Sequence, residues 1–394
     1  MSVASQIAFT DMPWAFDDVQ TDWRASVRAF AENELRSGAT DRSLAAETPD
    51  AIFDGLGKLG VFGLRVSQEN GGAGAGLTDL CIALEELARV DSSAAATAHT
   101  QGVVCALLEA MGSDEQKAAV LPDAVSGKTV LCFAITEPSG GSDAGDIHTR
   151  AVRDGDDWVL NGAKQFITNP GTPRSKYALL FANTGDGSED RRQVSGFLVP
   201  LDAPGVTVAP KYDKLGWRAS DTHPVFLDDV RLPASALLGT EHRGLRDAMA
   251  FLVWSRLPIA AVSTGLAQAC LEETLDFVAD RRSFGKGLAE HQAVAFDIAG
   301  LAADVAAARV LTYDGCYKFD HGIPYLQEAA VAKYMASEIA NRVAYRATQL
   351  HGGYGFMDDS AVTRHYRDAR ILTIGEGTSE IQQLVIARSV GLDV

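Results

Sequence analysis

The hydrophobic period of the sequence changes twice along the chain, and this order limits the fold more than any single motif does. Residues 16–127 place apolar side chains three and four positions apart, residues 129–238 carry short β-rich runs, and residues 241–386 return to the helical spacing. A doubly wound α/β enzyme would instead alternate strand and helix throughout. The sequence therefore predicts an α+β protein, mostly helical, with domains at 1–128, 129–240 and 241–394.

Individual elements follow from the local patterns. Helices are expected where apolar residues keep the helical spacing, and the glycine-rich run at 70–76 is expected to be a loop. The pair Asp154 and Gly155 between two β-rich runs is typical of a hairpin, so the middle zone is expected to be an antiparallel β domain. The expected helices are 23–35, 51–59, 77–90, 94–111 and 328–350, and the expected strands are 130–136, 151–153, 158–160, 176–183, 194–199 and 206–208.

The charge and composition exclude several classes of protein. Lysine and arginine number 35 against 52 aspartate and glutamate, and the net charge of −17 repels the phosphates of nucleic acids. With 46% hydrophobic and 22% charged residues the chain is globular rather than disordered. The N-terminus lacks a signal-peptide pattern and no apolar stretch approaches the roughly 20 residues of a membrane span. A cytoplasmic protein without membrane contact is therefore expected.

The sequence lacks the common nucleotide, metal and disulfide motifs. The glycines at 71–76 follow a helical region and lack the G-x-G-x-x-G spacing of a Rossmann site, and neither a P-loop nor H-E-x-x-H occurs. The five cysteines include no C-x-x-C pair, which favours reduced thiols over a disulfide or zinc framework. His351 and His365 have no ligand-spaced partners, so no metal site is expected.

Three glycine-rich segments carry the candidate chemistry. In 134–145 (AITEPSGGSDAG) an expected strand leads into a turn whose N–H groups and hydroxyls can face a polar ring or a phosphate. Residues 349–359 (QLHGGYGFMDD) place glycines on an expected helix, where each costs about 1 kcal/mol and so indicates close packing or a ligand. In 374–382 (IGEGTSEIQ) Glu376 stands between two glycines, which allow the backbone to approach a ligand closely.

These segments resemble the signatures of the acyl-CoA dehydrogenases, and the resemblance covers nearly the whole chain. Four further stretches are similar to that family: 161–169, 214–222, 238–244 and 281–286. The first signature departs at Asp146, where a small residue is usual. The family's fold implies an N-terminal helical domain, a central β barrel-like domain and a C-terminal four-helix domain. The C-terminal signature is matched at Gln349, Gly352, Gly353, Gly355, Phe356, Asp359, Arg364 and Asp368.

The resemblance implies that FAD binds between the β domain and the C-terminal helices of a homo-oligomer, usually a tetramer. Arg281 and Phe284 are implied to reach the FAD of a neighbouring subunit, where a guanidinium suits the pyrophosphate. The implied flavin-lining residues are Phe133, Ile135, Thr136, Gly141 and Ser142 on one side and Phe166, Ile167 and Thr168 on the other, and the further implied cofactor contacts are Gln292, Gln349, Gly352, Gly353, Thr378 and Glu380.

The same resemblance implies a reaction in which an acyl-CoA becomes a 2-enoyl-CoA. Glu376 is implied to remove the α-proton while the β-hydrogen leaves as hydride to flavin N5, and an electron-transfer flavoprotein is the implied acceptor. Other members carry the base near 254–255, but Trp254 and Ser255 are not acidic here. The N–H of Glu376 is implied to help stabilise the developing enolate. The implied substrate contacts are Ser142, Arg256, Gly375 and Gly377.

Simpler roles for the same residues stay open on the sequence alone. Glu376 could cap the helix that follows it, Arg281 could be a surface charge at a helix end, and Arg256 could form a structural ion pair.

Two departures from the family pattern bear on the substrate. Gly375 stands where relatives usually have tyrosine, which favours a branched, cyclic or otherwise bulky acyl group unless His99 or Trp254 refills the space. Val253 stands where some relatives have aspartate near the thioester arm, so an acyl group tethered to a carrier protein is an alternative substrate. A flavin oxidase or monooxygenase on the same fold also stays open, as does a flavin-free relative.

Overall fold

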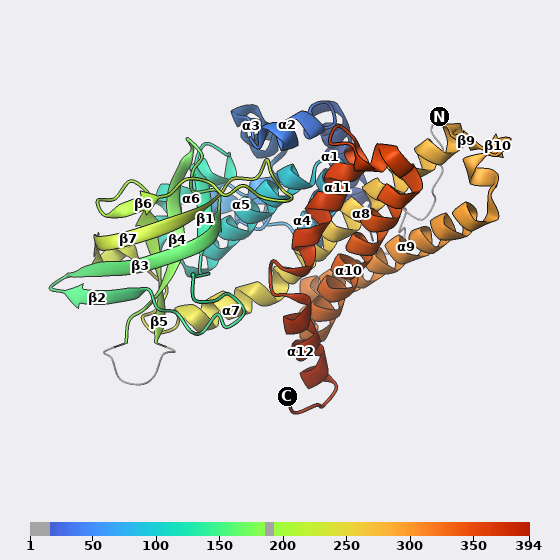
Figure 1. Cartoon of the computed structure of the whole chain (residues 1–394). Coiled ribbons are helices and arrows are strands. Elements are labelled where there is room, and N and C mark those ends of the chain that lie inside the picture. The colour runs from blue at the N-terminus through green and yellow to red at the C-terminus, as the bar shows by residue number, and fades with distance from the viewer. Residues whose placement is uncertain (1–15, 186–192) are drawn as a thin grey trace.

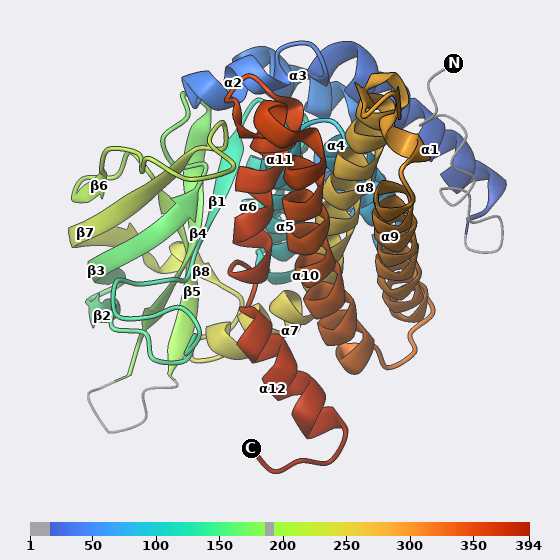
Figure 2. The same ribbon diagram turned by 45° about the vertical axis from the view of Figure 1, so that its right-hand side comes forward.

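The computed structural model describes residues 16–185 and 193–394, which form a helical, a β and a second helical part (Figure 1). The β part lies on one side of the helices, and α8 packs between α4 and α10 (Figure 2). This arrangement confirms the predicted α+β fold. The N-terminal helices are α1 (Asp18–Phe30), α2 (Ala39–Ala45), α3 (Asp50–Leu59), α4 (Leu77–Ala88), α5 (Ser92–Met111) and α6 (Asp114–Val125), and the C-terminal helices are α7 (Gly244–Trp254), α8 (Arg256–Asp280), α9 (Gln292–Asp320), α10 (Leu326–His351), α11 (Ala361–Ala369) and α12 (Ser379–Ser389).

The helices begin and end at recognisable sequence signals. A capping box of Asp17 and Gln20 starts α1, and a π-helical stretch, Ala31–Leu35, extends it to the predicted end. The helices α2 and α6 lie outside the predicted ranges. A second capping box, formed by Ser113 and Gln116, nevertheless marks the start of α6.

The β part is a mixed sheet rather than a purely antiparallel one. The strands β2 and β3 form the predicted hairpin, with Asp154 opposite Asp157, but β1 pairs with β4 in parallel, which corrects the antiparallel expectation. Along the sheet the order is β6-β7-β3-β2-β4-β5-β8. The strands are β1 (Val130–Ala134), β2 (Arg150–Asp154), β3 (Asp157–Thr168), β4 (Ser175–Asn183), β5 (Val194–Pro200), β6 (Val206–Val208), β7 (Thr222–Pro233) and β8 (Leu237–Leu238), and a separate ribbon joins β9 (Arg282–Ser283) to β10 (Lys286–Gly287).

Two hydrophobic cores hold these parts together. The larger core unites the N- and C-terminal helices and includes Leu131, Phe181 and Leu198 from the sheet. The smaller core lies within the β part around Trp158 and Phe197, whose rings meet edge-on with centroids 5.3 Å apart. Because β1 and β4 contribute to both cores, they fix the sheet against the helices, and the end of β1 lies at the boundary between the two.

The segment Gly244–Asp280 is long and apolar enough to span a membrane, contrary to the expectation that no such stretch exists. In the fold, 67% of its most apolar window is buried. Its apolar side chains therefore pack inside the protein, as those of a central core helix do.

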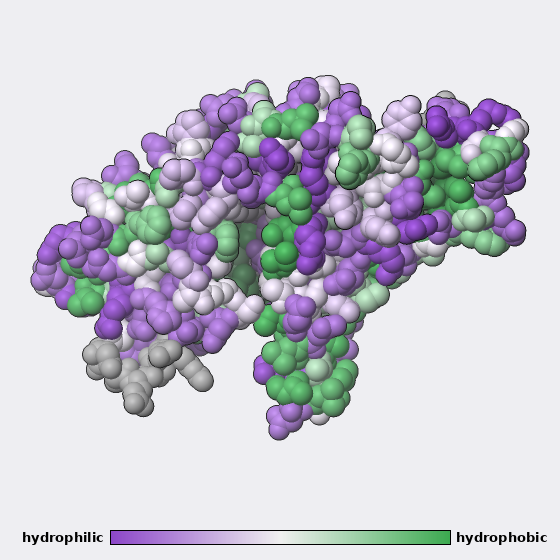
Figure 3. Space-filling view, in the orientation of Figure 1, coloured by the Kyte–Doolittle hydropathy of each residue, from purple (hydrophilic) through white to green (hydrophobic). Residues whose placement is uncertain are grey.

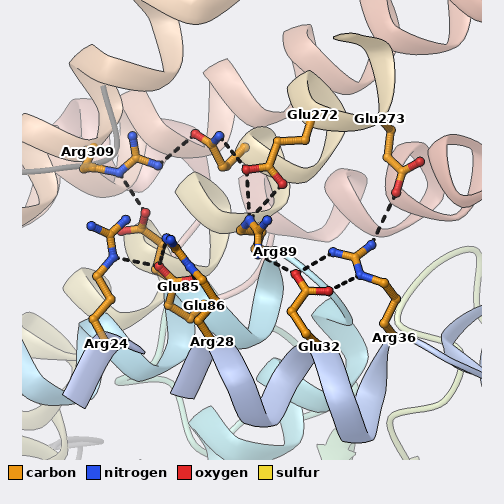
Figure 4. Close-up of polar contacts among 11 residues, drawn as sticks. Arg24, Arg28, Glu32, Arg36, Glu85, Glu86, Arg89, Glu272, Glu273 and Arg309 are labelled. Carbon is orange, nitrogen blue, oxygen red and sulfur yellow. Dashed lines mark hydrogen bonds and ion pairs between the residues drawn. The ribbon is translucent and has the colours of Figure 1, made fainter. Parts of the chain in front are cut away.

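A network of buried ion pairs joins α1, α4, α8 and α9 (Figure 4). Arg309 of α9 donates a 2.7 Å hydrogen bond to Glu85 of α4, and both side chains are almost fully buried. Arg24 of α1 donates to the adjacent Glu86, also over 2.7 Å. Because a buried charge is costly unless it is paired, the network specifies how these helices align. Its other members are Arg28, Glu32, Arg36, Arg89, Gln268, Glu272 and Glu273.

Candidate active site

Glu376 lies in a tight turn between α11 and α12. Its backbone adopts a left-handed conformation with φ of 54°, and Gly377 follows with φ of 82°. A left-handed conformation is uncommon for a residue other than glycine and is found most often where the surrounding structure enforces it. The Glu376 Oε2 accepts a 2.9 Å hydrogen bond from the hydroxyl of Ser255, which stands at the start of α8. The turn therefore brings a carboxylate to the junction of α7 and α8.

Two further ionisable side chains approach Glu376 from other helices. Burial lowers the pKa of the Arg256 guanidinium, against the opposing attraction of the Glu376 charge, and its buried Nη1 has no hydrogen-bond partner. His99 of α5 is 4% exposed, and burial likewise lowers its pKa while its ring lies against the backbone of Ser255. Among the described residues, Arg256 therefore has no carboxylate within ion-pair distance.

Side chains of α10 and α12 donate hydrogen bonds to the carbonyl groups of the turn. The amide of Gln382 in α12 donates to the carbonyl oxygens of Glu376 and Gly377 over 3.2 and 3.0 Å. Lys333 of α10 donates to the same Gly377 carbonyl over 2.6 Å. The φ of 82° favours glycine at residue 377, and a Cβ added there would stand 2.6 Å from the Gln382 amide nitrogen, so it would displace that side chain.

Space is open beside the carboxylate at Gly375. A Cβ at this position would have only atoms of Ile371 within 4 Å, at 3.6 and 3.9 Å, which is ordinary contact. The Trp254 ring instead packs against Phe251 and Phe319, with centroids 4.9 and 6.2 Å away. Neither Trp254 nor His99 has an atom within 4 Å of a Cβ at position 375. Figure 3 shows the surface hollowed between the β part and the C-terminal helices, with apolar residues inside the hollow.

The segment after β1 lies at the same boundary between the β part and the C-terminal helices. The Phe133 ring is half-buried and lies 5.8 Å from that of Phe251 in α7, which places the end of β1 against the C-terminal helices. The next residues line a small pocket, which includes Thr136 and Gly141. The family resemblance implies that four residues after Phe133 also line the flavin. Of these, Ile135 and Thr136 are half-buried, whereas Gly141 and Ser142 are exposed.

A buried ion pair holds this segment in place. Glu137 accepts hydrogen bonds from the backbone N–H groups of His148 and Thr149 over 2.7 and 2.9 Å and from the Lys164 ammonium over 2.7 Å. Burial lowers the pKa of Lys164 to about 8 in spite of the nearby Glu137 charge. The sequence pattern alone does not indicate this pair, although Glu137 lies inside the first signature.

The three implied residues of β3 do not all face the same way. Phe166 is 60% exposed with φ of 59° at an irregularity of the strand, and Thr168 is half-exposed. Ile167 is only 2% exposed and belongs to the core of the β part, because successive side chains of a strand point to opposite faces. Contact between Ile167 and a flavin therefore stays a prediction, and in this structure it would be made through the backbone of Ile167.

A second group of expected cofactor residues gathers at the opposite end of α8. Phe284 is 96% exposed with φ of 50°, in the β9–β10 ribbon, which lies far from the β part (Figure 1). The Arg281 guanidinium lies 5.8 Å from the centroid of the Tyr354 ring, and Gln292 and Gln349 are exposed. The structure thus separates Arg281, Phe284, Gln292, Gln349, Gly352 and Gly353 from the group around Glu376.

The glycines of this second group differ in what they do. A Cβ at Gly355 would stand 2.3 Å from the carbonyl oxygen of Thr348, so Gly355 is required for packing. A Cβ at Gly352 or Gly353 would meet nothing within 4 Å, although φ of 59° itself favours glycine at 352. Packing among the described residues therefore does not explain Gly353.

The last two expected cofactor residues lie at the start of α12. Thr378 is the N-cap of this helix and accepts a hydrogen bond from the N–H of Ile381 over 3.3 Å. Glu380 is exposed in the first turn. Thr378 rather than Glu376 thus caps α12, and the Glu376 carboxylate is free for another role. Across residues 16–185 and 193–394, no three His, Cys, Asp or Glu side chains gather as a metal site requires.

Comparison with known proteins gives matches along almost the whole chain. Family models described as the N-terminal, middle and C-terminal domains of acyl-CoA dehydrogenase match residues 17–128, 132–230 and 242–391. The human mitochondrial short-chain specific acyl-CoA dehydrogenase is 39% identical over 361 residues, 91% of this chain and 87% of the human one. CarC, a subunit of the caffeyl-CoA reductase-Etf complex of Acetobacterium woodii, is 38% identical over 366 residues, 92% of this chain and 96% of CarC. A solved glutaryl-CoA dehydrogenase of Mycobacterium smegmatis in complex with FADH2 matches with a TM-score of 0.91 and 31% identity, over 97% of each chain.

Proposed function

The chain belongs to the acyl-CoA dehydrogenase family, and we propose that Glu376 is the base that removes the α-proton of its acyl-CoA substrate. The protein is an FAD-dependent oxidoreductase that introduces a double bond between the α and β carbons of an acyl-CoA. The observation that carries the assignment is the Glu376 carboxylate itself. It is presented on a strained turn, held by Ser255 and flanked by the unpaired guanidinium nitrogen of Arg256.

The residues of the turn have distinct tasks in this reaction. When bound, FAD supplies the acceptor for the hydride that leaves the β-carbon. The Glu376 carboxylate takes the α-proton, and the hydrogen bond from Ser255 limits the directions in which that carboxylate can point. No described residue accepts a hydrogen bond from the N–H of Glu376, so this donor is available to the thioester carbonyl oxygen as negative charge develops there.

The residues present fit FAD in two places. Near Glu376, Thr136, Gly141, Ser142 and the exposed ring of Phe166 offer polar donors and an aromatic face for the flavin. At the far end of α8, the open positions at Gly352 and Gly353 permit close approach, and Arg281 has no carboxylate partner among the described residues. An unpaired guanidinium beside an open glycine pair suits a pyrophosphate.

The separation of these two groups supports a homo-oligomer in which each FAD touches two subunits. We propose a tetramer built from dimers. Large apolar side chains are exposed at Phe284 and Phe356, and the region of α12 and the C-terminal residues shows a mainly hydrophobic surface in Figure 3. Such surfaces usually mark contacts with another protein. Subunit contacts would bury Val390, Leu392 and Val394, each more than half exposed in one chain.

Complementation between two inactive variants tests the shared site. Glu376→Gln should remove the base, and Arg281→Ala should weaken FAD binding at the neighbouring subunit by removing a bond to its pyrophosphate. Co-expression with two different tags yields mixed oligomers, in which a subunit with an intact Glu376 can receive the intact Arg281 of its neighbour. Mixed oligomers are expected to regain up to half of the wild-type turnover per dimer. If they stay as inactive as both parents, Arg281 serves its own subunit and the shared site is wrong.

The open position at Gly375 supports a bulky acyl substrate. A tyrosine there would stand beside the base, and neither Trp254 nor His99 lies within 4 Å of the vacant Cβ position. We therefore propose that the acyl group is branched, cyclic or aromatic near its reacting carbons.

Anaerobic bleaching of the bound flavin by a panel of acyl-CoA thioesters tests the reaction and this preference together. Straight, branched, cyclic and aromatic acyl groups are compared in the wild type and in Gly375→Tyr. The wild type is expected to reduce its flavin fastest with bulky groups, and Gly375→Tyr to lose about 10-fold or more on those groups while keeping the straight ones, since a few misplaced atoms in a pocket change binding by about 1–3 kcal/mol. Equal preference in both proteins would contradict the substrate proposal, and no bleaching by any thioester would contradict the reaction.

We propose an electron-transfer flavoprotein as the electron acceptor, a partner supported by the name of the related CarC complex. Fast reoxidation of the bleached flavin by O₂ would instead favour an oxidase or monooxygenase. Adding the same acyl groups on a carrier protein tests whether the substrate is carrier-bound, because a carrier-dependent enzyme would bleach only with those.

A further inference from the structure

Lys333 is a buried lysine whose ammonium bonds to the backbone rather than to a carboxylate. It is 0% exposed on α10, and its Nζ donates to the Gly377 carbonyl over 2.6 Å. No described carboxylate lies within ion-pair distance of it. Removing an ammonium from water is costly, so its placement behind the turn calls for an explanation other than packing.

The bond acts on the peptide group between Gly377 and Thr378, one peptide beyond the one that follows Glu376. Glu376 and Gly377 both have left-handed backbone conformations, which glycine adopts readily but a glutamate does not favour. Because the C=O and N–H of a trans peptide point in opposite directions, a Gly377 carbonyl held toward Lys333 turns the next N–H the other way. Gln382 holds the carbonyl of Glu376 in the same manner. Together the two donors specify which way the turn presents its side chain.

The rest of the segment is anchored to the same helix by neutral or peripheral contacts. Asn341 donates to the carbonyl of Ala369 over 2.8 Å, and the Ser379 hydroxyl donates to Glu338 over 2.6 Å. Lys333 is the member of this set that contacts the turn itself, and the one that brings a positive charge to it.

We propose that Lys333 is a positioning residue that holds the Gly377 carbonyl and thereby fixes the turn that aims the Glu376 carboxylate at the α-proton. This inference rests on the proposed role of Glu376 and adds to it the group that holds the base in place. Lys333 acts through the backbone and does not touch the substrate.

The protonated form of Lys333 makes the stronger bond, because a charge-assisted hydrogen bond is roughly twice as strong as a neutral one. Burial lowers its pKa to about 8, against the attraction of Glu376, Glu338 and Glu380 and with the repulsion of Arg256. The ammonium is therefore present below pH 8 and is lost as the pH rises through that value. Positioning by Lys333 should weaken on the alkaline side.

Exchange of the α-protons of a thioester into D₂O reports on the base without hydride transfer. The CoA thioester of 3,3-dimethylbutanoic acid has α-protons but no β-hydrogen, so it cannot be dehydrogenated. The FAD-loaded enzyme is incubated with it, and deuterium uptake is measured by mass spectrometry in the wild type, Lys333→Met, Lys333→Arg and Gln382→Leu. Tyr334→Phe is the matched control, because Tyr334 is the next residue of α10 and contacts Gln383 of α12 rather than the turn.

Lys333→Met is expected to slow exchange about 10–100-fold per bound flavin, which is the range for losing a hydrogen bond to a charged group. Gln382→Leu is expected to slow exchange by a smaller factor than Lys333→Met does. In the wild type the exchange rate is expected to decline about 5-fold above pH 8, and Lys333→Arg should retain most of the rate and lose this decline. Tyr334→Phe should exchange at the wild-type rate.

The outcomes separate the two proposals. If Glu376→Gln keeps the wild-type exchange rate, the assignment of the base fails. If Glu376→Gln loses exchange but Lys333→Met and Gln382→Leu keep it per bound flavin, only the positioning role is overturned. The positioning role would also be overturned if Lys333→Met yields little folded protein and Lys333→Arg keeps the pH profile of the wild type, because a purely structural lysine gives that pattern.

Discussion

Glu376→Gln is expected to lower turnover about 10²–10⁴-fold while FAD and substrate remain bound. Glutamine keeps the size of the side chain and can still meet the Ser255 hydroxyl through its amide oxygen, so the turn should keep its conformation. What it loses is the basicity of the carboxylate, because an amide oxygen is far too weak a base to take the α-proton. In free-energy terms the loss is about 3–5 kcal/mol of transition-state stabilisation.

Stopped-flow measurement of flavin bleaching under anaerobic conditions checks this result, with the flavin content and the dissociation constant of the substrate measured alongside. Glu328→Gln on α10 is the control, because Glu328 forms a partly exposed ion pair with Lys318 and lies outside the site. Bleaching in Glu376→Gln within a few-fold of the wild-type rate would show that another group removes the proton. Ser255→Ala keeps the base but removes its hydrogen bond, so its bleaching rate should lie between those of the wild type and Glu376→Gln.

The sequence was sufficient to predict the order of the three parts because each has its own hydrophobic period. It did not indicate β7, where Pro224 and the left-handed Asp229 interrupt the alternation of a strand that pairs with β3 along most of its length. The parallel pairing of β1 with β4 also has no local signal, since it depends on the path of the chain between them. Strand pairings that depend on distant parts of the chain were therefore missed, as were the helices α2 and α6, which lie outside the predicted ranges.

The candidate site divides in the same way. Glu376 and its two glycines are adjacent in sequence, so their pattern alone pointed to a ligand. Ser255 and Lys333 come from α8 and α10, and only the fold brings them to the turn. The sequence did contain one indication of Lys333: it is a single lysine on a helix face otherwise formed by small residues such as Ala329 and Ala336. A charge on the buried face of a helix is unusual enough to be a signal in the sequence itself.

Arg309→Met is expected to destabilise the folded protein by about 3–5 kcal/mol, the range for breaking one side of a buried ion pair. The Glu85 carboxylate would keep its 2.8 Å hydrogen bond from the Tyr313 hydroxyl but lose the guanidinium that balances its charge. Gln268 would also lose the donor that bonds its side-chain oxygen over 3.0 Å. The helices α4, α8 and α9 meet at this point, so the loss should appear in the unfolding of the whole helical core (Figure 4).

Chemical denaturation followed by far-UV circular dichroism measures the effect, and two further proteins identify its cause. Glu85→Gln combined with Arg309→Met removes the stranded charge while leaving a hydrogen-bonding side chain for Tyr313, and it should recover more than half of the lost stability. Arg342→Met breaks an ion pair with Asp304 that is partly exposed, and it should cost no more than about 1 kcal/mol. If the double variant is as unstable as Arg309→Met, lost packing rather than an unpaired charge is responsible. Turnover per bound flavin should stay unchanged in all three, because the network holds the helices together without contacting the turn that carries Glu376.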